Sequence, residues 1–580
     1  MCGILGQVAN DKVNEADFIK NLLKMKSRGP DDYGTYFDNY ISLGQTRLSV
    51  IDLSVNGHQP MISNCGNYVI IYNGEVYNCN EIKEDLLKKN IRFESGTDTE
   101  VILNGFIEYQ EGIVSKLNGM FAFSIYDKTT KRLFIARDKS GIKPLYYYKI
   151  DDKFAYSSEL KALKKDLSPI NFEAKILFLL LGYVPEPYSI YEDILMFPAG
   201  HYGYYQDNEL IVNKFDEYIY NPKIIKPYDE IVSDVSEILH DVIERQLISD
   251  APIGVFLSGG LDSSIVTAIA SKFKANLNTL SVVFEDSNFS EEYYQDLVAL
   301  KFKTKHVRYM VNDELFLKTI DDFLECMEQP TIDGLNTYFV SKAAKETGLT
   351  VALSGVGADE IFYGYPSFKN GKSLKFLSKI PCSIIKIFEF SNKYKKLELL
   401  NAEKELSYYL PKRALFAPRE IARILKIDVA VVYGLIVNLY NTYNASHIQK
   451  IEDIISYYEL NMYMKNQLLR DSDLFGMANS LEVRVPFLDN KLVDYLLKVD
   501  SRHKFGAYNK NLLADVAKNI LPSEILKRPK MGFTLPFEVW FKNNIDEFNV
   551  EKEVKHKFIN GQITWAKFWA IFILKRFEDD

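Results

Sequence analysis

Long apolar runs are missing from this 580-residue sequence. No uninterrupted stretch reaches the roughly 18 residues that a helix needs to span a bilayer. The opening residues, MCGILGQVAN, contain neither the basic segment nor the long apolar segment of a secretory signal peptide. We therefore expect a cytoplasmic protein without a membrane partner.

Cysteine and histidine are scarce, and neither occurs in a paired motif. The sequence has 5 cysteines and 7 histidines, with no C-x-x-C pair and no H-E-x-x-H. An odd number of unpaired cysteines favours reduced thiols over a disulfide framework or a zinc site. Without H-E-x-x-H, the sequence lacks the usual zinc ligands of a metal-dependent hydrolase.

An excess of positive charge is also absent. Lys and Arg number 70 against 78 Asp and Glu, which gives a net charge of -8, and no basic stripe carries interleaved aromatic residues. Nucleic acid is therefore an unexpected partner. Hydrophobic residues make up 47% and charged residues 26%, which is ordinary globular composition. A single core stops growing near roughly 250–300 residues, so two domains are expected.

The sequence pattern changes near the middle of the chain. Residues 1–213 contain short alternating runs separated by Asn, Gly and Asp turns, which predicts sheets flanked by helices. From residue 228 to 580, strand patterns such as PIGVFL alternate with helical ones and then give way to helices, which is typical of a parallel α/β sheet with a helical C-terminal part. Residues 207–227 are the expected linker.

Cys2 is the first candidate nucleophile. Removal of Met1, which a small second residue permits, would make Cys2 the N-terminal residue. Its free α-amino group, with a pKa near about 8, can then accept the thiol proton in place of a histidine. The alternative is that Cys2 is a buried small hydrophobic residue.

Four motifs follow Cys2 in an order that resembles the class II glutamine amidotransferases: RGPDDYG (28–34), TRLSVID (46–52), YNGEVYN (72–78) and GTDTEV (96–101). The resemblance implies that the Asn73 side-chain amide and the Gly74 backbone N–H form an oxyanion hole beside the catalytic Cys2. Arg47 suits the carboxylate of glutamine, and Asp98 with Glu75 suits its ammonium group. The alternative for these charged residues is surface ion pairing. The expected glutamine-binding residues are Arg47, Leu48, Ser49, Val50, Ile51, Asn73, Gly74, Glu75 and Asp98.

The motif LSGGLDSS (257–264) comes directly after the strand pattern PIGVFL and opens a helix. Its glycines let the backbone approach phosphates, and the helix N-terminus favours negative charge. It lacks the Gly-Lys-Ser/Thr of a Walker A loop and resembles the pyrophosphate loop of N-type ATP pyrophosphatases. The alternative is an ordinary helix cap.

A second turn, LSGVGADE (353–360), also follows a predicted strand. Asp262 and Asp359 are the expected ligands of Mg²⁺, which prefers carboxylate oxygens. Lys510 is expected to stabilise phosphate charge, with an exposed helix lysine as the alternative. The expected ATP-binding residues are Phe256, Leu257, Ser258, Gly259, Gly260, Asp262, Ser263, Val282, Ser354, Gly355 and Lys510.

Two further segments, NSLEVRVPFLD (479–489) and KNLLADVAKNILPSEILKRPKMGFTLP (510–536), resemble the C-terminal pattern of glutamine-hydrolysing asparagine synthetases. The resemblance implies an N-terminal nucleophile αββα sandwich over 1–213 and an α/β ATP pyrophosphatase domain over 228–580. It also implies that ammonia released from glutamine attacks an acyl adenylate, with AMP, pyrophosphate, glutamate and an amide as products. A homodimer is an assembly that the resemblance allows.

Three departures from the family pattern concern the acceptor. Val356 stands where the family usually has Glu or Asp, and Gly476 stands where it usually has Ser. The segment EQPTIDGLNTY (328–338) is more similar to amidotransferases that amidate uronic acid sugars in surface-polysaccharide synthesis. The carboxylate acceptor can therefore be aspartate or a uronic acid sugar nucleotide or glycan. For amidation of the uronic acid, we expect another base, such as Glu328 or the bound pyrophosphate, to replace the missing acid.

Other classes of protein share only part of these features. Glutamine phosphoribosylpyrophosphate amidotransferase and glucosamine-phosphate synthase would lack SGGLDSS together with SGVGADE. A non-enzymatic binding or regulatory descendant is the remaining alternative, and it would be expected to have lost Cys2, Asn73, Asp262 or Asp359, all of which are present.

Overall fold

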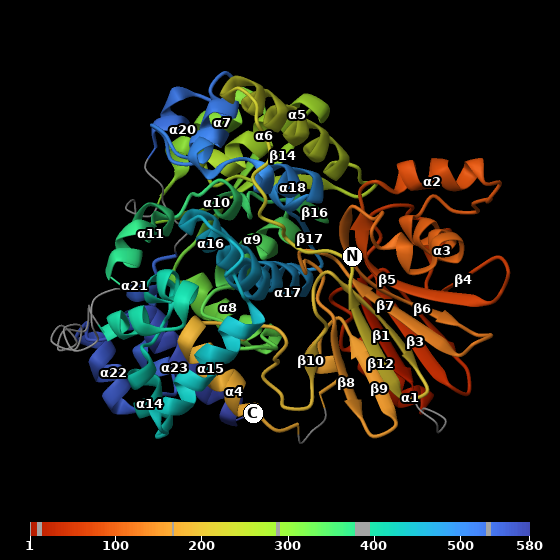
Figure 1. Ribbon diagram of the computed structural model, residues 1–580, viewed down its shortest axis with the longest axis horizontal. Coiled ribbons are helices and arrows are strands. Elements are labelled where there is room, and N and C mark those ends of the chain that lie inside the picture. Colours follow the sequence, from red (N-terminus) through yellow and green to blue (C-terminus); the bar gives the residue numbers. More distant parts are fainter. Residues whose placement is uncertain are drawn as a thin grey trace.

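The computed structural model describes residues 2–8, 14–164, 168–285, 290–377, 395–528 and 535–579. Met1, which must be removed if the α-amino group of Cys2 is to act as a base, lies outside these ranges. Residues 529–534, part of the motif at 510–536, also lie outside them. An N-terminal β-rich half and a larger, mainly helical half lie side by side (Figure 1). Buried ion pairs and hydrogen bonds join the two halves.

Two antiparallel six-stranded sheets form the centre of the N-terminal half. One has the strand order β10-β8-β9-β1-β3-β2 and the other β12-β11-β7-β6-β5-β4. The strands are β1 (Cys2–Val8), β2 (Asp32–Phe37), β3 (Ile41–Arg47), β4 (Met61–Ile62), β5 (Tyr68–Val76), β6 (Gly119–Asp127), β7 (Arg132–Arg137), β8 (Tyr146–Ile150), β9 (Lys153–Ser157), β10 (Leu195–Met196), β11 (His201–Gln206) and β12 (Glu209–Lys214).

Side-chain alternation explains why these sheets stack. On β5, Val69 and Ile71 pack between the two sheets, whereas Ile70 and Tyr72 pack on the opposite face. Helices α2 (Cys79–Lys88) and α3 (Asp98–Tyr109) cover that opposite face, and α1 (Glu15–Leu23) and α4 (Phe172–Leu181) contribute to the core beyond the other sheet. The layer order is helix, sheet, sheet, helix, which confirms the predicted αββα sandwich.

A five-stranded parallel sheet organises the second half, with the order β15-β14-β13-β16-β17. Its strands are β13 (Ile253–Phe256), β14 (Asn278–Phe284), β15 (Lys305–Val311), β16 (Val351–Leu353) and β17 (Glu482–Arg484). Buried clusters on both faces account for the nearly continuous apolar character of β13 and β16. The predicted α/β fold is confirmed.

In the described part of this half, helices surround the sheet (Figure 1). They are α5 (Tyr228–Gln246), α6 (Leu261–Phe273), α7 (Glu292–Phe302), α8 (Asp313–Cys326), α9 (Leu335–Glu346), α10 (Ala358–Ile361), α11 (Pro366–Leu377), α13 (Leu410–Arg413), α14 (Pro418–Leu425), α15 (Val429–Thr442), α16 (Ile451–Tyr458), α17 (Arg470–Ala478), α18 (Asn490–Lys498), α19 (Asn511–Ala517), α20 (Ser523–Lys527), α21 (Phe537–Asn543), α22 (Lys552–Ile559) and α23 (Trp565–Asp579). A π-helical segment, Glu459–Leu469, joins α16 to α17.

The expected linker needs one correction. Its first part, Glu209–Lys214, is not a connection but the edge strand β12, paired with β11. Five of its six residues are exposed, so this edge strand lacks the alternation of buried and exposed residues by which a sequence pattern indicates a strand. The segment between β12 and α5 has no helix or strand.

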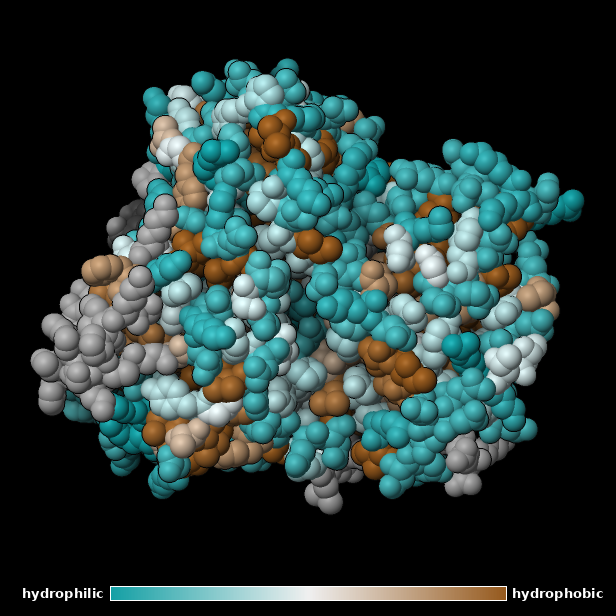
Figure 2. Space-filling model, viewed as in Figure 1, coloured by the Kyte–Doolittle hydropathy of each residue, from teal (hydrophilic) through white to brown (hydrophobic). Residues whose placement is uncertain are grey.

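Hydrophilic residues cover much of the face seen in Figure 2, and hydrophobic residues form separate patches on it. Within the ranges that the structure describes, no helix combines the length and apolar character that crossing a membrane requires.

Candidate active sites

Cys2 lies where the two N-terminal sheets meet. Strand pairing places it opposite Arg47 on β3, and its side chain is buried. The backbone N–H of Cys2 donates to Asn73 Oδ1 on β5 at 3.0 Å, and Arg28 Nε donates to the Cys2 carbonyl oxygen at 3.0 Å. Both sides of the Cys2 main chain are therefore held by side chains that come from distant segments.

The thiol of Cys2 is in an environment that disfavours its charged form. Burial raises the pKa of the Cys2 thiol, although the backbone N–H of Leu48 and the guanidinium of Arg47 oppose the rise. A neutral buried thiol is a weak nucleophile, so it needs a base close by.

The expected glutamine-binding segment 47–51 continues from the end of β3. Arg47 donates to the carbonyl oxygens of Asp52 at 2.5 Å and Ser54 at 2.9 Å, which fixes its guanidinium. The backbone N–H of Ser49 donates to Asp31 Oδ2 at 2.8 Å. Asp31 belongs to the motif RGPDDYG, to which the sequence analysis gave no role, and it orients this segment.

The two expected ammonium-binding carboxylates, Asp98 and Glu75, lie at the same end of β5. Asp98 begins α3 and accepts from Tyr72 Oη at 2.7 Å and from the backbone N–H of Val76 at 3.0 Å. Burial raises the pKa of Asp98. Burial also raises the pKa of Glu75 well above its ordinary range, against the effect of Arg484, whose Nη2 lies 3.4 Å from Glu75 Oε2.

The oxyanion-hole candidates occupy adjacent positions on β5. Asn73 Nδ2 lies 3.5 Å from Ser158 Oγ, which also accepts from the backbone N–H of Ile4 at 3.1 Å. Only glycine fits at position 74, because a Cβ there would lie 2.2 Å from the carbonyl oxygen of Met120 on the neighbouring strand. Ser158 is a neighbour of this site that the sequence analysis missed.

The second candidate site begins at the loop between β13 and α6. Gly259 has φ +70°, and a Cβ there would lie 2.8 Å from Cβ of Tyr294, so the turn requires glycine. The backbone N–H of Ser258 donates to Ser263 Oγ at 3.1 Å, which closes the loop over the first turn of α6. The strand, glycine turn and helix predicted for LSGGLDSS are all present.

A cavity of about 550 Å³ opens beside this loop. The expected ATP-binding residues that line it are Phe256, Leu257, Ser258, Asp262, Ser263, Val282, Ser354 and Gly355. Gly259, Gly260 and Lys510 do not line it. Gly260 instead precedes the first residue of α6, and Lys510 precedes α19.

Lys510 bridges the two predicted metal ligands. Its Nζ forms one ion pair with Asp262 and another with Asp359 at 2.8 Å, and its side chain is 5% exposed. Burial alone would lower the pKa of Lys510, but the two carboxylates raise it. Since Asp262 and Asp359 converge on one cationic group, their oxygens fit a shared Mg²⁺. Among the residues that the structure describes, no third His, Cys, Asp or Glu joins them to form a larger metal cluster.

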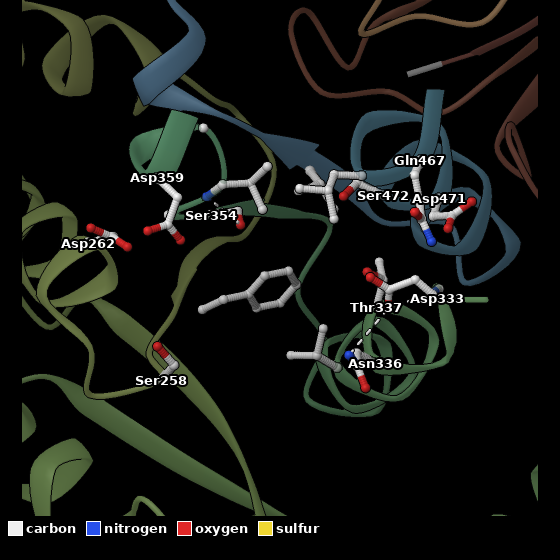
Figure 3. A pocket seen from close by; sticks show the side chains of 18 of the residues that line it. Ser258, Asp262, Asp333, Asn336, Thr337, Ser354, Asp359, Gln467, Asp471 and Ser472 are labelled. Atoms are coloured by element: carbon white, nitrogen blue, oxygen red, sulfur yellow. Dashed lines mark hydrogen bonds between the residues drawn. The ribbon is translucent and has the colours of Figure 1, made fainter. Parts of the chain in front are cut away.

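The cavity has two polar ends (Figure 3). Ser258, Asp262, Ser354 and Asp359 form one end. The opposite end carries Asp333, Asn336, Thr337, Gln467, Asp471 and Ser472. Part of the segment 328–338, which the sequence analysis associated with the acceptor, therefore reaches the cavity wall.

Arg413 is the only lysine or arginine among the described residues that line the cavity. Its guanidinium forms two hydrogen bonds with Glu459, at 2.9 and 2.6 Å, and lies over the rings of Tyr365 and Tyr463. Its charge is thus already balanced. No motif in the sequence marked Arg413, because Arg413 ends α13 whereas Glu459 and Tyr463 belong to the π-helical segment.

The three residues tied to acceptor choice lie in different places. Val356 lines the cavity, whereas Gly476 packs against the Leu481 carbonyl and Val483. Glu328, expected as a base, accepts from the backbone N–H groups of Leu160 at 2.7 Å and Lys161 at 3.3 Å and does not line the cavity. That expectation is wrong, because Glu328 is directed towards the N-terminal half.

Comparison with known proteins matches nearly the whole chain. Residues 1–216 match the model of the glutamine amidotransferase domain, and residues 234–558 match that of asparagine synthase. Glutamine-hydrolysing asparagine synthetase 1 of Bacillus subtilis is 32% identical over 569 residues, covering 94% of this chain and 89% of the relative. A putative asparagine synthetase 2 of Methanocaldococcus jannaschii is 37% identical over 412 residues, covering 66% of this chain and 79% of the relative.

Glu360 gives the second site a testable pH dependence. Burial, and then the neighbouring Asp359, raises the pKa of Glu360 to about 8, and its carboxyl accepts from Tyr365 Oη at 2.6 Å. An unfolded Glu titrates near about 4.3, so the stability from its protonated form is fully present below that pH and is lost as the pH rises through about 8.

We therefore expect Glu360→Gln, which stays neutral, to unfold near the parent temperature at about pH 5 but at a higher temperature than the parent at about pH 9. Thermal unfolding of both proteins at the two pH values measures this. Glu209→Gln, on the exposed strand β12, is the control and should leave both midpoints unchanged. An equal shift of the Glu360→Gln midpoint at both pH values would contradict the raised pKa.

Proposed function

Because this chain belongs to the asparagine synthase family, a family of glutamine-dependent amidotransferases for which ATP is a substrate, we propose that it transfers the amide nitrogen of glutamine to a carboxylate activated by ATP as an acyl adenylate. The single observation that supports this best is the presence of two separate sets of reactive groups in one chain. One surrounds Cys2 and the other surrounds the SGGLDSS loop.

In the first half-reaction, the Cys2 thiolate attacks the amide carbon of glutamine. The α-amino group freed by loss of Met1 accepts the thiol proton, and the pKa raised by burial makes this base necessary. The Asn73 side chain and the Gly74 N–H stabilise the oxyanion. Arg47 binds the glutamine carboxylate, Asp98 with Glu75 binds its ammonium group, and water then releases glutamate after ammonia has left.

In the second half-reaction, the acceptor carboxylate attacks the α-phosphate of ATP and pyrophosphate leaves. The SGGLDSS loop and the N-terminus of α6 bind phosphate oxygens. Lys510 supplies positive charge. Asp262 and Asp359 would hold Mg²⁺, which neutralises pyrophosphate charge when bound. Ammonia then displaces AMP from the acyl adenylate to form the amide.

Aspartate is the first candidate acceptor, since the relatives are named asparagine synthetases. The carboxylates of Asp333 and Asp471 suit its ammonium group. A uronic acid sugar nucleotide or glycan is the second candidate. It is favoured by the amide and hydroxyl groups at one end of the cavity and by Val356 in the lining, where the family usually has an acid. Among the described residues that line the cavity, the one cation, Arg413, is bound to Glu459.

The proposed division of labour predicts that Cys2→Ala abolishes glutamine hydrolysis but leaves amidation from ammonium salts, because only the first half-reaction uses the thiol. Glutamate release and AMP release, measured on the full chain, separate the two activities. An unprocessed Met1 should act like the substitution. Persistent glutaminase activity in Cys2→Ala would rule out the assigned nucleophile.

ATP should yield AMP and pyrophosphate, and Asp262→Asn or Asp359→Asn should suppress this reaction while glutamine cleavage continues. Each change removes a negative ligand where pyrophosphate charge must be neutralised. Product analysis with labelled ATP tests the claim, and Asp241→Asn on α5 serves as a control outside the cavity lining. ADP and phosphate as products would indicate an acyl phosphate instead.

The Val356 side chain gives a prediction about the acceptor. A general base contributes about 10²–10⁴-fold in rate, so if nothing replaces the missing acid and a nucleotide-linked uronic acid is the acceptor, aspartate should be amidated at least roughly a hundredfold more slowly than that sugar. Val356→Glu should increase asparagine formation, and Val356→Gln, similar in size but without a base, should not. Steady-state assays at saturating ATP and ammonium decide this. Efficient asparagine formation by the unaltered chain, with no uronamide product, would favour aspartate.

A further inference from the structure

Arg28 connects the candidate nucleophile to the other half of the molecule. Its Nε donates to the Cys2 carbonyl oxygen at 3.0 Å, and its Nη1 lies 3.2 Å from Glu159 Oε1 and 2.7 Å from Asp473 Oδ2. Arg28 and Glu159 belong to the region matched as the amidotransferase domain, whereas Asp473 lies in the region matched as asparagine synthase. One of the two carboxylates that hold Arg28 is therefore supplied by the other domain.

Asp473 is a charged group in a nearly closed environment. The Asp473 side chain is 2% exposed, and its Oδ1 lies 3.1 Å from Nζ of Lys143. The Lys143 side chain is fully buried. Burial alone would raise the pKa of Asp473, but Arg28 and Lys143 hold it below its ordinary value. A buried carboxylate between two cations fixes their positions, because loss of any one member leaves an uncompensated charge.

The helix that carries Asp473 also forms part of the cavity wall. Asp471 and Ser472 line the cavity and are drawn there in Figure 3. At about 100° per residue, side chains two positions apart on a helix point about 200° apart. A single turn of α17 thus presents Asp471 to the cavity and Asp473 to the amidotransferase domain. Ser480, just beyond α17, adds a second tie by donating to the carbonyl oxygen of Ser27 at 2.7 Å.

We propose that Asp473 is a positioning residue for glutamine hydrolysis, supplied by the asparagine synthase domain. It holds Arg28, and Arg28 fixes the main chain of Cys2, so that the thiol is correctly placed only when α17 is docked against the sandwich. This inference rests on the proposed role of Cys2 as nucleophile. It makes the glutaminase site dependent on the helix that also shapes the acceptor end of the cavity.

The test uses full-length variants. Asp473→Asn removes the charge, and the double change Lys143→Met with Asp473→Asn removes it together with the lysine that would otherwise be left unpaired. Asp494→Asn is the matched control, because its pair with Lys139 at 2.7 Å joins the same two domains but does not contact Cys2 or Arg28. For each protein, glutamate release gives kcat and KM for glutamine, and AMP release with ammonium salts gives the activity of the second site.

We expect both Asp473 variants to lower kcat for glutamine hydrolysis about tenfold to a hundredfold, the effect of misplacing a reacting group by about 1 Å. The KM for glutamine should change by less than about threefold, because the glutamine-binding residues remain in place. AMP formation with ammonium should stay within about twofold, and Asp494→Asn should leave both activities within that range.

Three results would overturn the inference: an unchanged kcat in both Asp473 variants, a change confined to KM, or an equal loss of both activities, which would indicate general structural damage. A parallel assay of Cys2→Ala distinguishes failure of the positioning role of Asp473 from failure of the proposed nucleophile. If Cys2→Ala still hydrolyses glutamine, the nucleophile itself is wrong. If it is inactive while Asp473→Asn is not impaired, only the positioning role fails.

Discussion

Buried charged side chains from both domains meet where the amidotransferase sandwich packs against α17 and β17. Asp473 pairs with Arg28 and Lys143, and nearby Arg484 pairs with Glu482 and lies 3.4 Å from Glu75. Removing such charges from water costs several kcal/mol per ion, so a buried pair contributes little net stability. Its effect is geometric, since the pairs of Asp473 with Arg28 and Lys143 and of Arg484 with Glu75 form only when the two domains are docked in this arrangement.

That docking connects the chemistry of the two sites. Glu75, expected to bind glutamine, lies next to Arg484 at the end of β17, and the Arg484 carbonyl accepts from the backbone N–H of Ser354 in the cavity wall at 2.8 Å. The two sites are therefore joined by direct contacts between packed strands and a helix, and protein interiors are packed as densely as organic crystals.

Much of the fold could be predicted because the signals are local. Val69 to Tyr72 alternate between two buried faces, and PIGVFL precedes a glycine turn and a helix, so strand and loop positions follow from short stretches of sequence. The edge strand Glu209–Lys214 was missed, because its mostly exposed residues lack such a signal.

The family and the two fold classes followed from the sequence, and so did the prediction of the reactive residues of both candidate sites, because most of these residues lie in short motifs whose spacing is fixed by one turn. The tertiary structure alone decided how those residues are held. Arg28 with Asp473, Arg413 with Glu459, and the turn of Glu328 away from the cavity all depend on side chains that lie 46 to 445 positions apart or in different domains. No periodicity or spacing records such contacts, because burial and charge balance are properties of the packed chain.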